Sequence, residues 1–127
     1  NPVAVAAGLK TLKIIQRPGF YEQLSARTTQ LVQGLSQAAK QAGLTFCADS
    51  EGGMFGLYFA SQCPQTSADM AASNTDGFKA FFHGMLDNGV AFGPSAYEAG
   101  FVSAAHTSEL IEQAIDAARP VFARMAP

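Results

Sequence analysis

An aromatic stripe between residues 75 and 87 is the strongest periodic pattern in the sequence. Its large apolar side chains recur at steps of three and four residues, the spacing of one face of an α-helix: Phe78, Phe81, Phe82, Met85 and Leu86. Thr75 or Asp76 is a suitable N-cap, and Asn88-Gly89 ends the pattern. We therefore expect an amphipathic helix that buries its aromatic face against other elements.

The patterns on either side of this stripe predict three more helices and four short strands. The helices run from Pro2 to Ile15, from about Pro18 to Ala42-Gly43, and from Thr107 onward, where Pro120 is expected to kink or restart the last helix. Short apolar segments bounded by glycines predict strands at 44–47, 54–59, 90–92 and 101–105, with 49–53 as an acidic turn between the first two. Residues 61–74 predict a loop with one helical turn near 68–72.

This order of elements predicts an α+β fold, with helices packed on one face of a small, mainly antiparallel sheet. A chain of 127 residues with 48% hydrophobic residues is long enough to bury its own core. The formal charge of -2 and the scattered basic residues argue against nucleic acid or a membrane surface as a partner. The sequence opens abruptly at Asn1-Pro2, inside a helical pattern, so we expect it to belong to a longer protein.

Cysteines and histidines give no sign of a metal or redox site. Cys47 and Cys63 are too far apart for a C-x-x-C motif and lack histidines at metal-ligand spacing. We expect them to be buried free thiols, although the sequence leaves a disulfide open. His83 and His106 stand apart from each other and from carboxylate pairs, so no metal site is expected.

The stretch from Asn88 to His106, NGVAFGPSAYEAGFVSAAH, holds the best candidate for a functional site. Gly93-Pro94-Ser95 breaks the backbone there and leaves one carboxylate, Glu98, between two apolar segments. Loops on a rigid scaffold often carry binding residues. The residues alone favour the alternative that Glu98 points into water from a turn and has no function.

Four segments of the chain resemble one enzyme family in the same order. The segments are NPVAVAAGLKTL, GGMFGLYF, DGFKAFFHGMLDNGV and PSAYEAGFVSAAHT. The chain is similar, over nearly its whole length, to the glutamate-1-semialdehyde 2,1-aminomutases, pyridoxal-phosphate enzymes on the class III aminotransferase scaffold. The resemblance implies that residues 17–127 form the small C-terminal α+β domain, and that residues 1–16 form a helix that packs on the missing large domain. In that family an N-terminal segment completes the small domain.

The resemblance also implies an activity for the longer protein. Such an enzyme converts glutamate-1-semialdehyde to 5-aminolevulinate for tetrapyrrole (porphyrin) synthesis, through a diamino intermediate, as a cytoplasmic homodimer with no nucleic-acid or membrane partner. Its Schiff-base lysine and phosphate-binding segment lie upstream of the position that matches Asn1. The four lysines here fall on helical patterns and resemble surface residues: Lys10, Lys13, Lys40 and Lys79. We therefore expect the fragment alone neither to bind the cofactor nor to be active.

Glu98 is the position at which the resemblance is most informative. Many class III aminotransferases carry an arginine there, which pairs with a substrate carboxylate, whereas the aminomutases carry glutamate. The resemblance implies that Glu98 disfavours external amino acids and retains the cationic diamine, with Ser95 as a hydrogen-bond donor to substrate or to Glu98. The alternatives are a class III ω-aminotransferase and a non-catalytic α+β interaction or sensing module.

Overall fold

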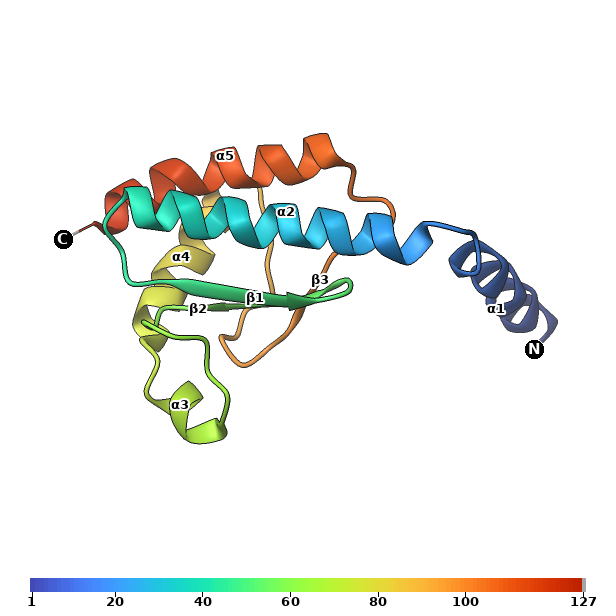
Figure 1. The fold of residues 1–127 in the computed structure, drawn as a ribbon, viewed down its shortest axis with the longest axis horizontal. Helices are drawn as coiled ribbons and strands as arrows, with labels where there is room; N and C mark the ends of the chain where they lie inside the picture. Colours follow the sequence, from blue (N-terminus) through green and yellow to red (C-terminus); the bar gives the residue numbers. More distant parts are fainter. Residues whose placement is uncertain (127) are drawn as a thin grey trace.

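A computed structural model describes residues 1–126 and shows an α+β arrangement (Figure 1). Within these residues, five helices and three strands follow one another: α1 (Pro2–Ile15), α2 (Phe20–Gln41), β1 (Cys47–Glu51), β2 (Met54–Tyr58), α3 (Ser67–Ala71), α4 (Thr75–Asp87), β3 (Gly100–Phe101) and α5 (Ser108–Met125). The predicted fold class is confirmed, and so are the four long helices and the short helical turn within 61–74. None of the helices within residues 1–126 combines the length and the apolarity needed to cross a bilayer.

The sheet is antiparallel throughout, in the order β1-β2-β3. β1 and β2 form a hairpin in which Glu51 pairs with Met54, so the turn between them contains only Gly52 and Gly53. Gly52 adopts φ 57°, a left-handed conformation that suits glycine. The short strand β3 pairs with the other side of β2, and one backbone bond from Val102 N to Gly53 O (2.8 Å) extends this pairing.

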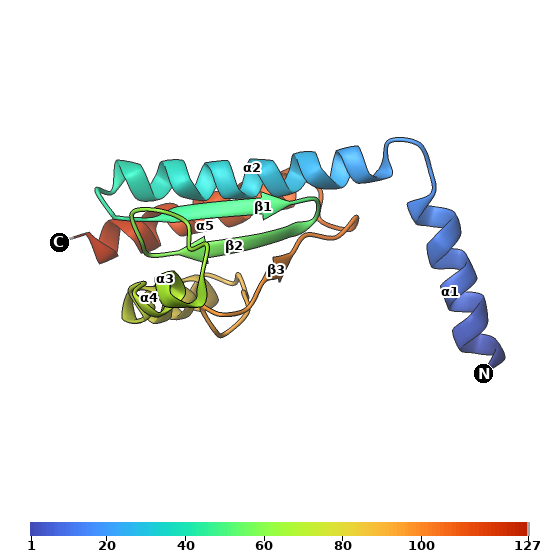
Figure 2. The ribbon, with the colours of Figure 1, turned by 60° about the horizontal axis from the view of Figure 1, so that its bottom comes forward.

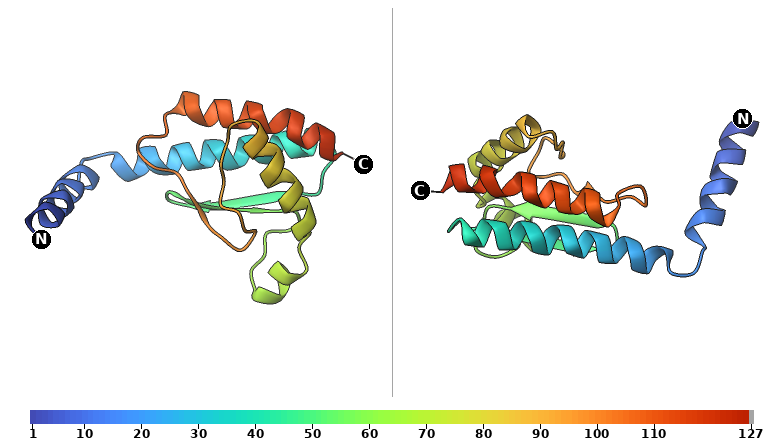
Figure 3. Two further views of the ribbon diagram at one scale, coloured as in Figure 1. Left: turned by 180° about the vertical axis from the view of Figure 1, so that it is seen from behind. Right: turned by 90° about the horizontal axis from the view of Figure 1, so that it is seen from above.

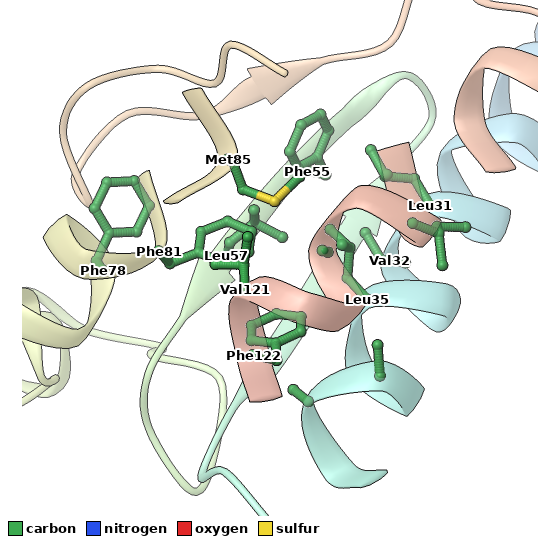
Figure 4. Packing of buried hydrophobic residues seen from close by; sticks show 14 of the residues in the cluster. Leu31, Val32, Leu35, Phe55, Leu57, Phe78, Phe81, Met85, Val121 and Phe122 are labelled. Carbon is green, nitrogen blue, oxygen red and sulfur yellow. The ribbon is translucent and has the colours of Figure 1, made fainter. Parts of the chain in front are cut away.

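One face of the sheet and three helices enclose a single hydrophobic core. The alternation along β2 and just beyond it points Phe55, Leu57 and Phe59 into this core, where helices α2, α4 and α5 supply the remaining apolar side chains (Figure 4). Phe81 of α4 and Phe122 of α5 are fully buried and stack with ring centroids 5.0 Å apart. The aromatic stripe predicted at 75–87 thus forms the centre of the core.

Helices α2 and α5 lie side by side along the same layer (Figures 1 and 3). Gly34 makes their close approach possible, because a Cβ atom at this position would lie 2.7 Å from Ile115 Cγ1 and closer still to Cδ1. Polar contacts tie the first half of α2 to the turn before α5 and to the first residue of α5: Arg27 Nη1 donates to Ala104 O (3.0 Å), and Ser108 Oγ donates to Gln30 Oε1 (2.9 Å). Helix α2 therefore holds both the 103–106 turn and the start of α5.

The predicted strands were only partly right. The first strand is Cys47–Glu51 rather than 44–47, so the acidic residues predicted for a turn, Asp49 and Glu51, belong to β1. Phe46 instead packs its ring against Phe59 and Phe122 at the end of the core. The polar sequence of β1 forms a strand because β2 supplies hydrogen bonds to its backbone and only one of its faces is covered.

The two strands predicted after α4 are also corrected. Residues 90–92 form no strand, since no neighbouring segment pairs with them, and only Gly100–Phe101 of the second prediction is extended and paired. Residues 103–106 instead form a turn, in which Ser103 N donates to His106 Nδ1 (2.9 Å) and His106 N donates to Ser103 O (3.1 Å).

The last helix continues through Pro120, so of the two predicted effects, a kink or a restart of the helix, the restart does not occur. Proline removes only the bond from its own nitrogen to the carbonyl of Asp116. Both residues are exposed, so water can satisfy that carbonyl. The next two residues, Val121 and Phe122, are buried in the core and retain the helix.

Helix α1 projects away from the rest of the domain (Figures 1 and 2). None of its residues is buried. Ile14 and Ile15 at its end are partly covered, whereas its other large apolar side chains are strongly exposed: Val3, Val5, Leu9 and Leu12. Asn1 caps the helix by accepting a hydrogen bond from Val3 N (3.0 Å), and Pro2 occupies the first helical position. Local capping and helix propensity therefore define α1, whereas its apolar surface has no partner within residues 1–126.

Candidate functional site

The loop that carries Glu98 starts from a well-defined helix end. Gly89 takes φ 81° and closes α4, with Gly89 N donating to Leu86 O (3.0 Å) and Val90 N donating to Met85 O (2.9 Å). Phe92 then anchors the loop in the core, with its ring 5.7 Å from that of Phe81. The loop is irregular in backbone but is fixed at its base by aromatic packing.

A tight turn at residues 95–98 sets the position of Glu98. Ser95 contributes twice: its carbonyl oxygen accepts from Glu98 N (3.1 Å), and its Oγ accepts from Tyr97 N (3.2 Å). The Ser95 hydroxyl proton takes no part in these bonds and stays available to a ligand. In the structure, Ser95 therefore shapes the turn.

The Glu98 side chain folds back over Gly93. A Cβ atom at residue 93 would lie only 2.7 Å from Glu98 Oε2, so the carboxylate occupies the space that the glycine leaves. Glu98 is exposed, and the salt bridges within residues 1–126 are Lys79–Asp76 and Arg119–Asp116, so none of them involves Glu98. The carboxylate is therefore accessible to a cation that approaches the loop.

Glu98 borders an open pocket of about 620 Å³ on the side of β2 that faces away from the core. Tyr58 of β2 and Thr66 and Met70 of the 61–71 segment form the opposite wall. A smaller hollow of about 260 Å³ adjoins it, shares Tyr58, and contains Asp49 and Glu51. No lysine, arginine or histidine lines either space, so this surface is acidic.

Tyr58 forms the boundary between the two hollows. Its ring lies over Gly56, where any side chain would collide with the phenol. Partial burial, followed by the nearby charges of Cys63 and Asp49, raises the pKa of Tyr58 above its ordinary value. The phenol is therefore a neutral hydrogen-bond donor at physiological pH.

A second large pocket, of about 610 Å³, lies on the opposite side of the loop. Its walls are mostly apolar and come from Phe55, the loop residues Val90–Gly93, β3 and α5, with His106 at the rim. His106 Nδ1 accepts the backbone proton of Ser103, which places the proton of the neutral imidazole on Nε2. This arrangement makes His106 part of a turn, as its isolation in sequence suggested.

The residues of this chain do not fit a pyridoxal-phosphate site. All four lysines are exposed on helices α1, α2 and α4, and Lys79 is paired with Asp76. Neither of the two large pockets contains a lysine or an arginine. Within residues 1–126 no three histidine, cysteine or acidic side chains are grouped to hold a metal ion. Within residues 1–126 these two pockets therefore offer no lysine for a Schiff base and no cationic side chain for a phosphate.

Sequence reasoning found Glu98 and Ser95 but missed the opposite wall of their pocket. Tyr58, Thr66 and Met70 come from segments that were interpreted only as a strand and a loop. The orientation of Tyr58 could have been predicted from the sequence. Phe55, Leu57 and Phe59 occupy alternate positions of a strand, which leaves Tyr58 on the opposite face. Cys47 and Cys63 are free but half-buried rather than buried, which corrects that expectation.

Comparison with known proteins gives high identity over nearly the whole chain. The glutamate-1-semialdehyde 2,1-aminomutase of Neisseria meningitidis serogroup B is 70% identical over 126 residues, and that of Laribacter hongkongensis is 59% identical over 125 residues. These matches cover 99% and 98% of this chain. The chain itself spans only 30% and 29% of the length of these relatives. The resemblance drawn from the four sequence segments is confirmed.

Solved structures give the same fold at lower identity. An ω-transaminase from Sphaerobacter thermophilus superposes with a TM-score of 0.79 at 19% identity, covering 98% of this chain and 28% of that protein. A transaminase with PLP bound gives 0.76 at 22% identity, covering 99% of this chain and 28% of that protein. Identities this low show the fold alone. No protein-family model matches the chain.

Proposed function

We propose that this chain is the C-terminal part of a glutamate-1-semialdehyde 2,1-aminomutase and provides one wall of its active site. The identity of 59–70% to enzymes of that name, over at least 98% of the chain, carries the proposal. In the complete enzyme, the remaining part would supply the pyridoxal phosphate and its lysine. The cofactor, when bound, provides the chemistry of amino-group transfer.

The role proposed for this chain is electrostatic selection of the substrate by Glu98. The side chain is exposed, has no ion-pair partner within residues 1–126, and lies at the rim of an open acidic pocket. A carboxylate in this position attracts the ammonium groups of a diamine and repels the carboxylate of an external amino acid. At about 5 Å, with an effective dielectric constant between ~20 and ~80, each such interaction amounts to about 1–3 kcal/mol.

Ser95 and Gly93 would keep this charge in place. Ser95 holds the turn through two backbone bonds, and Gly93 leaves room for the carboxylate. The Ser95 hydroxyl proton is free to bond to a substrate oxygen or to Glu98. Because the turn is anchored by Phe92 in the core, the carboxylate would stay oriented before substrate arrives, which reduces the cost of binding.

A chimera tests whether the chain belongs to such an enzyme. The matching 126 residues of the Neisseria meningitidis relative would be replaced by this chain, leaving the rest of the relative unchanged. We expect the chimera to form 5-aminolevulinate from glutamate-1-semialdehyde at a rate within about tenfold of the parent, a change of about 1.4 kcal/mol, because 70% of the exchanged positions keep the same residue. A folded, cofactor-loaded chimera that forms no product would refute the proposal.

The Glu98→Arg variant of the same chimera tests the role of the carboxylate. Charge reversal changes attraction to repulsion, so the preference for diamine over external amino acid should fall at least tenfold, a change of about 1.4 kcal/mol. The measurements are the release of diamine during turnover and the rate with an added amino-acid donor. Asp87→Arg is the matched control, since Asp87 is exposed and lies outside both large pockets. Equal diamine release from both variants would exclude the role proposed for Glu98.

The exposed apolar side of α1 supports a boundary near residue 16. Residues 1–16 would pack on the larger part of the enzyme and residues 17–127 would form its small domain, because Val3, Val5, Leu9 and Leu12 have no partner within residues 1–126. The homodimeric state, the cytoplasmic location and a purely small-molecule substrate belong to the same proposal.

A class III ω-aminotransferase is not favoured, since the ω-transaminase structure is only 19% identical to the chain.

A further inference from the structure

The side chain of His106 closes the turn between β3 and α5. Its Nδ1 accepts the backbone proton of Ser103 (2.9 Å), and His106 N donates in return to Ser103 O (3.1 Å). The Ser103 hydroxyl lies 3.3 Å from the same Nδ1 and accepts from Ala105 N (3.3 Å). Arg27 of α2 donates to Ala104 O (3.0 Å) and so holds the middle of the turn. Hydrogen bonds therefore define this turn, whose residues are all exposed.

The bond to Ser103 depends on the chemical state of the imidazole. In the neutral ring one nitrogen accepts and the other donates, and the Ser103 proton occupies Nδ1, so the ring proton lies on Nε2. The other tautomer and the imidazolium ion both carry a proton on Nδ1 and cannot accept this bond. A single nitrogen of His106 therefore decides whether the turn is closed.

The turn supports one end of a very short strand. β3 (Gly100–Phe101) pairs with β2 over two residues, and the buried Val102 donates from its backbone N to Gly53 O (2.8 Å). Ser103 is the next residue, so the amide that His106 binds directly follows the last bond to the hairpin. Because two paired residues stabilise a strand only weakly, the position of β3 depends on Val102 and on the turn that follows it.

Glu98 lies at the other end of β3. It precedes Gly100 by two residues. The loop that carries it is held on one side by Phe92, whose ring packs on that of Phe81, and on the other side by β3. No salt bridge within residues 1–126 holds the Glu98 carboxylate. A change at the end of β3 would therefore move the carboxylate.

We propose that His106 is a positioning residue for Glu98. Its Nδ1 keeps the turn closed, the closed turn keeps β3 paired with β2, and the paired strand keeps Glu98 at the rim of its pocket. His106 lines the other large pocket, so it acts through the backbone rather than by contact with the substrate. The inference rests on the proposed function for the role of Glu98, whereas the closed turn is a property of the chain itself.

The tautomer of His106 can be measured in this chain alone. The sequence contains two histidines, and a His83→Ala variant assigns the ring signals, because His83 is exposed on α4 and lies outside both large pockets. Long-range proton–nitrogen spectra at neutral pH should show an unprotonated Nδ1 and a protonated Nε2 on His106. In His106→Ala, solvent exchange of the Ser103 amide should accelerate by about threefold or more, the effect of one lost hydrogen bond. A protonated Nδ1, or an unchanged Ser103 amide, would overturn the proposal.

Three substitutions at residue 106 of the chimera test what the bond does for Glu98. Asparagine carries its acceptor Oδ1 at the place in the side chain that Nδ1 occupies in histidine, whereas the acceptor of glutamine is one atom farther out. His106→Ala and His106→Gln should therefore raise the diamine released per turnover by about threefold or more, and His106→Asn should stay within about twofold of the unaltered chimera. Circular dichroism and the cofactor absorbance check that each variant is folded and loaded. Equal diamine release from all three variants would contradict the role of the acceptor.

A double variant separates the positioning of Glu98 from a general loss of structure. In a Glu98→Ala chimera the carboxylate is absent, so adding His106→Ala should change diamine release by less than about twofold. An effect as large as in the chimera with Glu98 would mean that His106 acts by another route, and the proposal would fail. An unaltered chimera without activity would refute the proposed function, and the spectra of the chain alone would still support or refute the closed turn.

Discussion

Replacement of Gly34 by alanine has two opposite effects on stability: a gain from helix propensity and a loss from steric overlap in the core. Gly34 lies in the middle of α2, where alanine is favoured over glycine by about 1 kcal/mol. The added Cβ atom would, however, lie 2.7 Å from Ile115 Cγ1 and 3.1 Å from Cγ2, and even closer to Cδ1. Ile115 is buried and β-branched, so its χ1 angle is restricted and the new methyl group meets a stiff side chain.

The expected result is a net loss of stability. Overpacking of a well-filled core costs about 1–3 kcal/mol, and contact with three atoms of one stiff side chain places Gly34→Ala toward the upper end. Subtracting the helix-propensity gain of about 1 kcal/mol leaves a decrease of about 1–2 kcal/mol in the free energy of unfolding. For a domain of this size that lowers Tm by about 4 °C per kcal/mol.

Urea unfolding followed by circular dichroism measures this effect. Gly8→Ala is the matched control, because Gly8 is also inside a helix but a Cβ there meets no atom within 4 Å. The control should raise the helicity of α1 and leave the unfolding midpoint of the core unchanged. Adding Ile115→Val to Gly34→Ala should recover part of the loss, since it removes the Cδ1 atom that is closest to the new methyl group. A Gly34→Ala chain more stable than the original would refute the inferred close packing of α2 on α5.

Two further predictions concern the core and the capped helix α3. Phe122→Ala should lower the free energy of unfolding by about 3–5 kcal/mol in a urea titration, because its fully buried ring contacts Phe46 and Phe81 and leaves a cavity; an effect below about 1 kcal/mol would contradict the central role of the aromatic cluster. Hydrogen bonds from the Thr66 hydroxyl and, second, from the backbone NH of Gln65 lower the pKa of Asp69. The stability that the ionised Asp69 carboxylate gives to α3 is therefore fully present above the ordinary aspartate pKa, and it is lost as the pH falls through the lowered value. The protection of the α3 amides against hydrogen exchange, relative to the intrinsic rate at each pH, should therefore fall on acidification. In the Asp69→Asn variant this protection should not change with pH.

The helices were the part of the fold that the sequence predicted well. The stripe of Phe78, Phe81 and Met85 identified α4 and its buried side, since helical periodicity is local and three or four residues suffice to define a face. The stops at Gly43 and Gly89 were also readable, because both take left-handed φ values that other residues disfavour. The alanine and glycine pattern of α1 likewise predicted a helix.

The strands were predicted less well because a strand needs a partner. The segment from Cys47 to Glu51 is polar and shows little β propensity, yet it forms β1 since β2 pairs with its backbone. Val90–Phe92 is apolar and was predicted as a strand, but nothing pairs with it, and Phe92 packs into the core instead. Pairing is a property of two segments, and the sequence of one of them does not reveal it.

The candidate site shows the same division between local and distant information. Glu98 and Ser95 could be found from the loop and from the resemblance, because both lie within one short stretch. The residues that face them across the pocket, Tyr58 and Thr66, come from segments about 30–40 positions away, and only the hairpin brings them close.

Local sequence therefore determined the helices, their ends and the position of the charged turn, since each depends on neighbours along the chain. Folding in three dimensions decided the strand pairing and the opposite wall of the pocket, because these depend on which distant segments share a buried face.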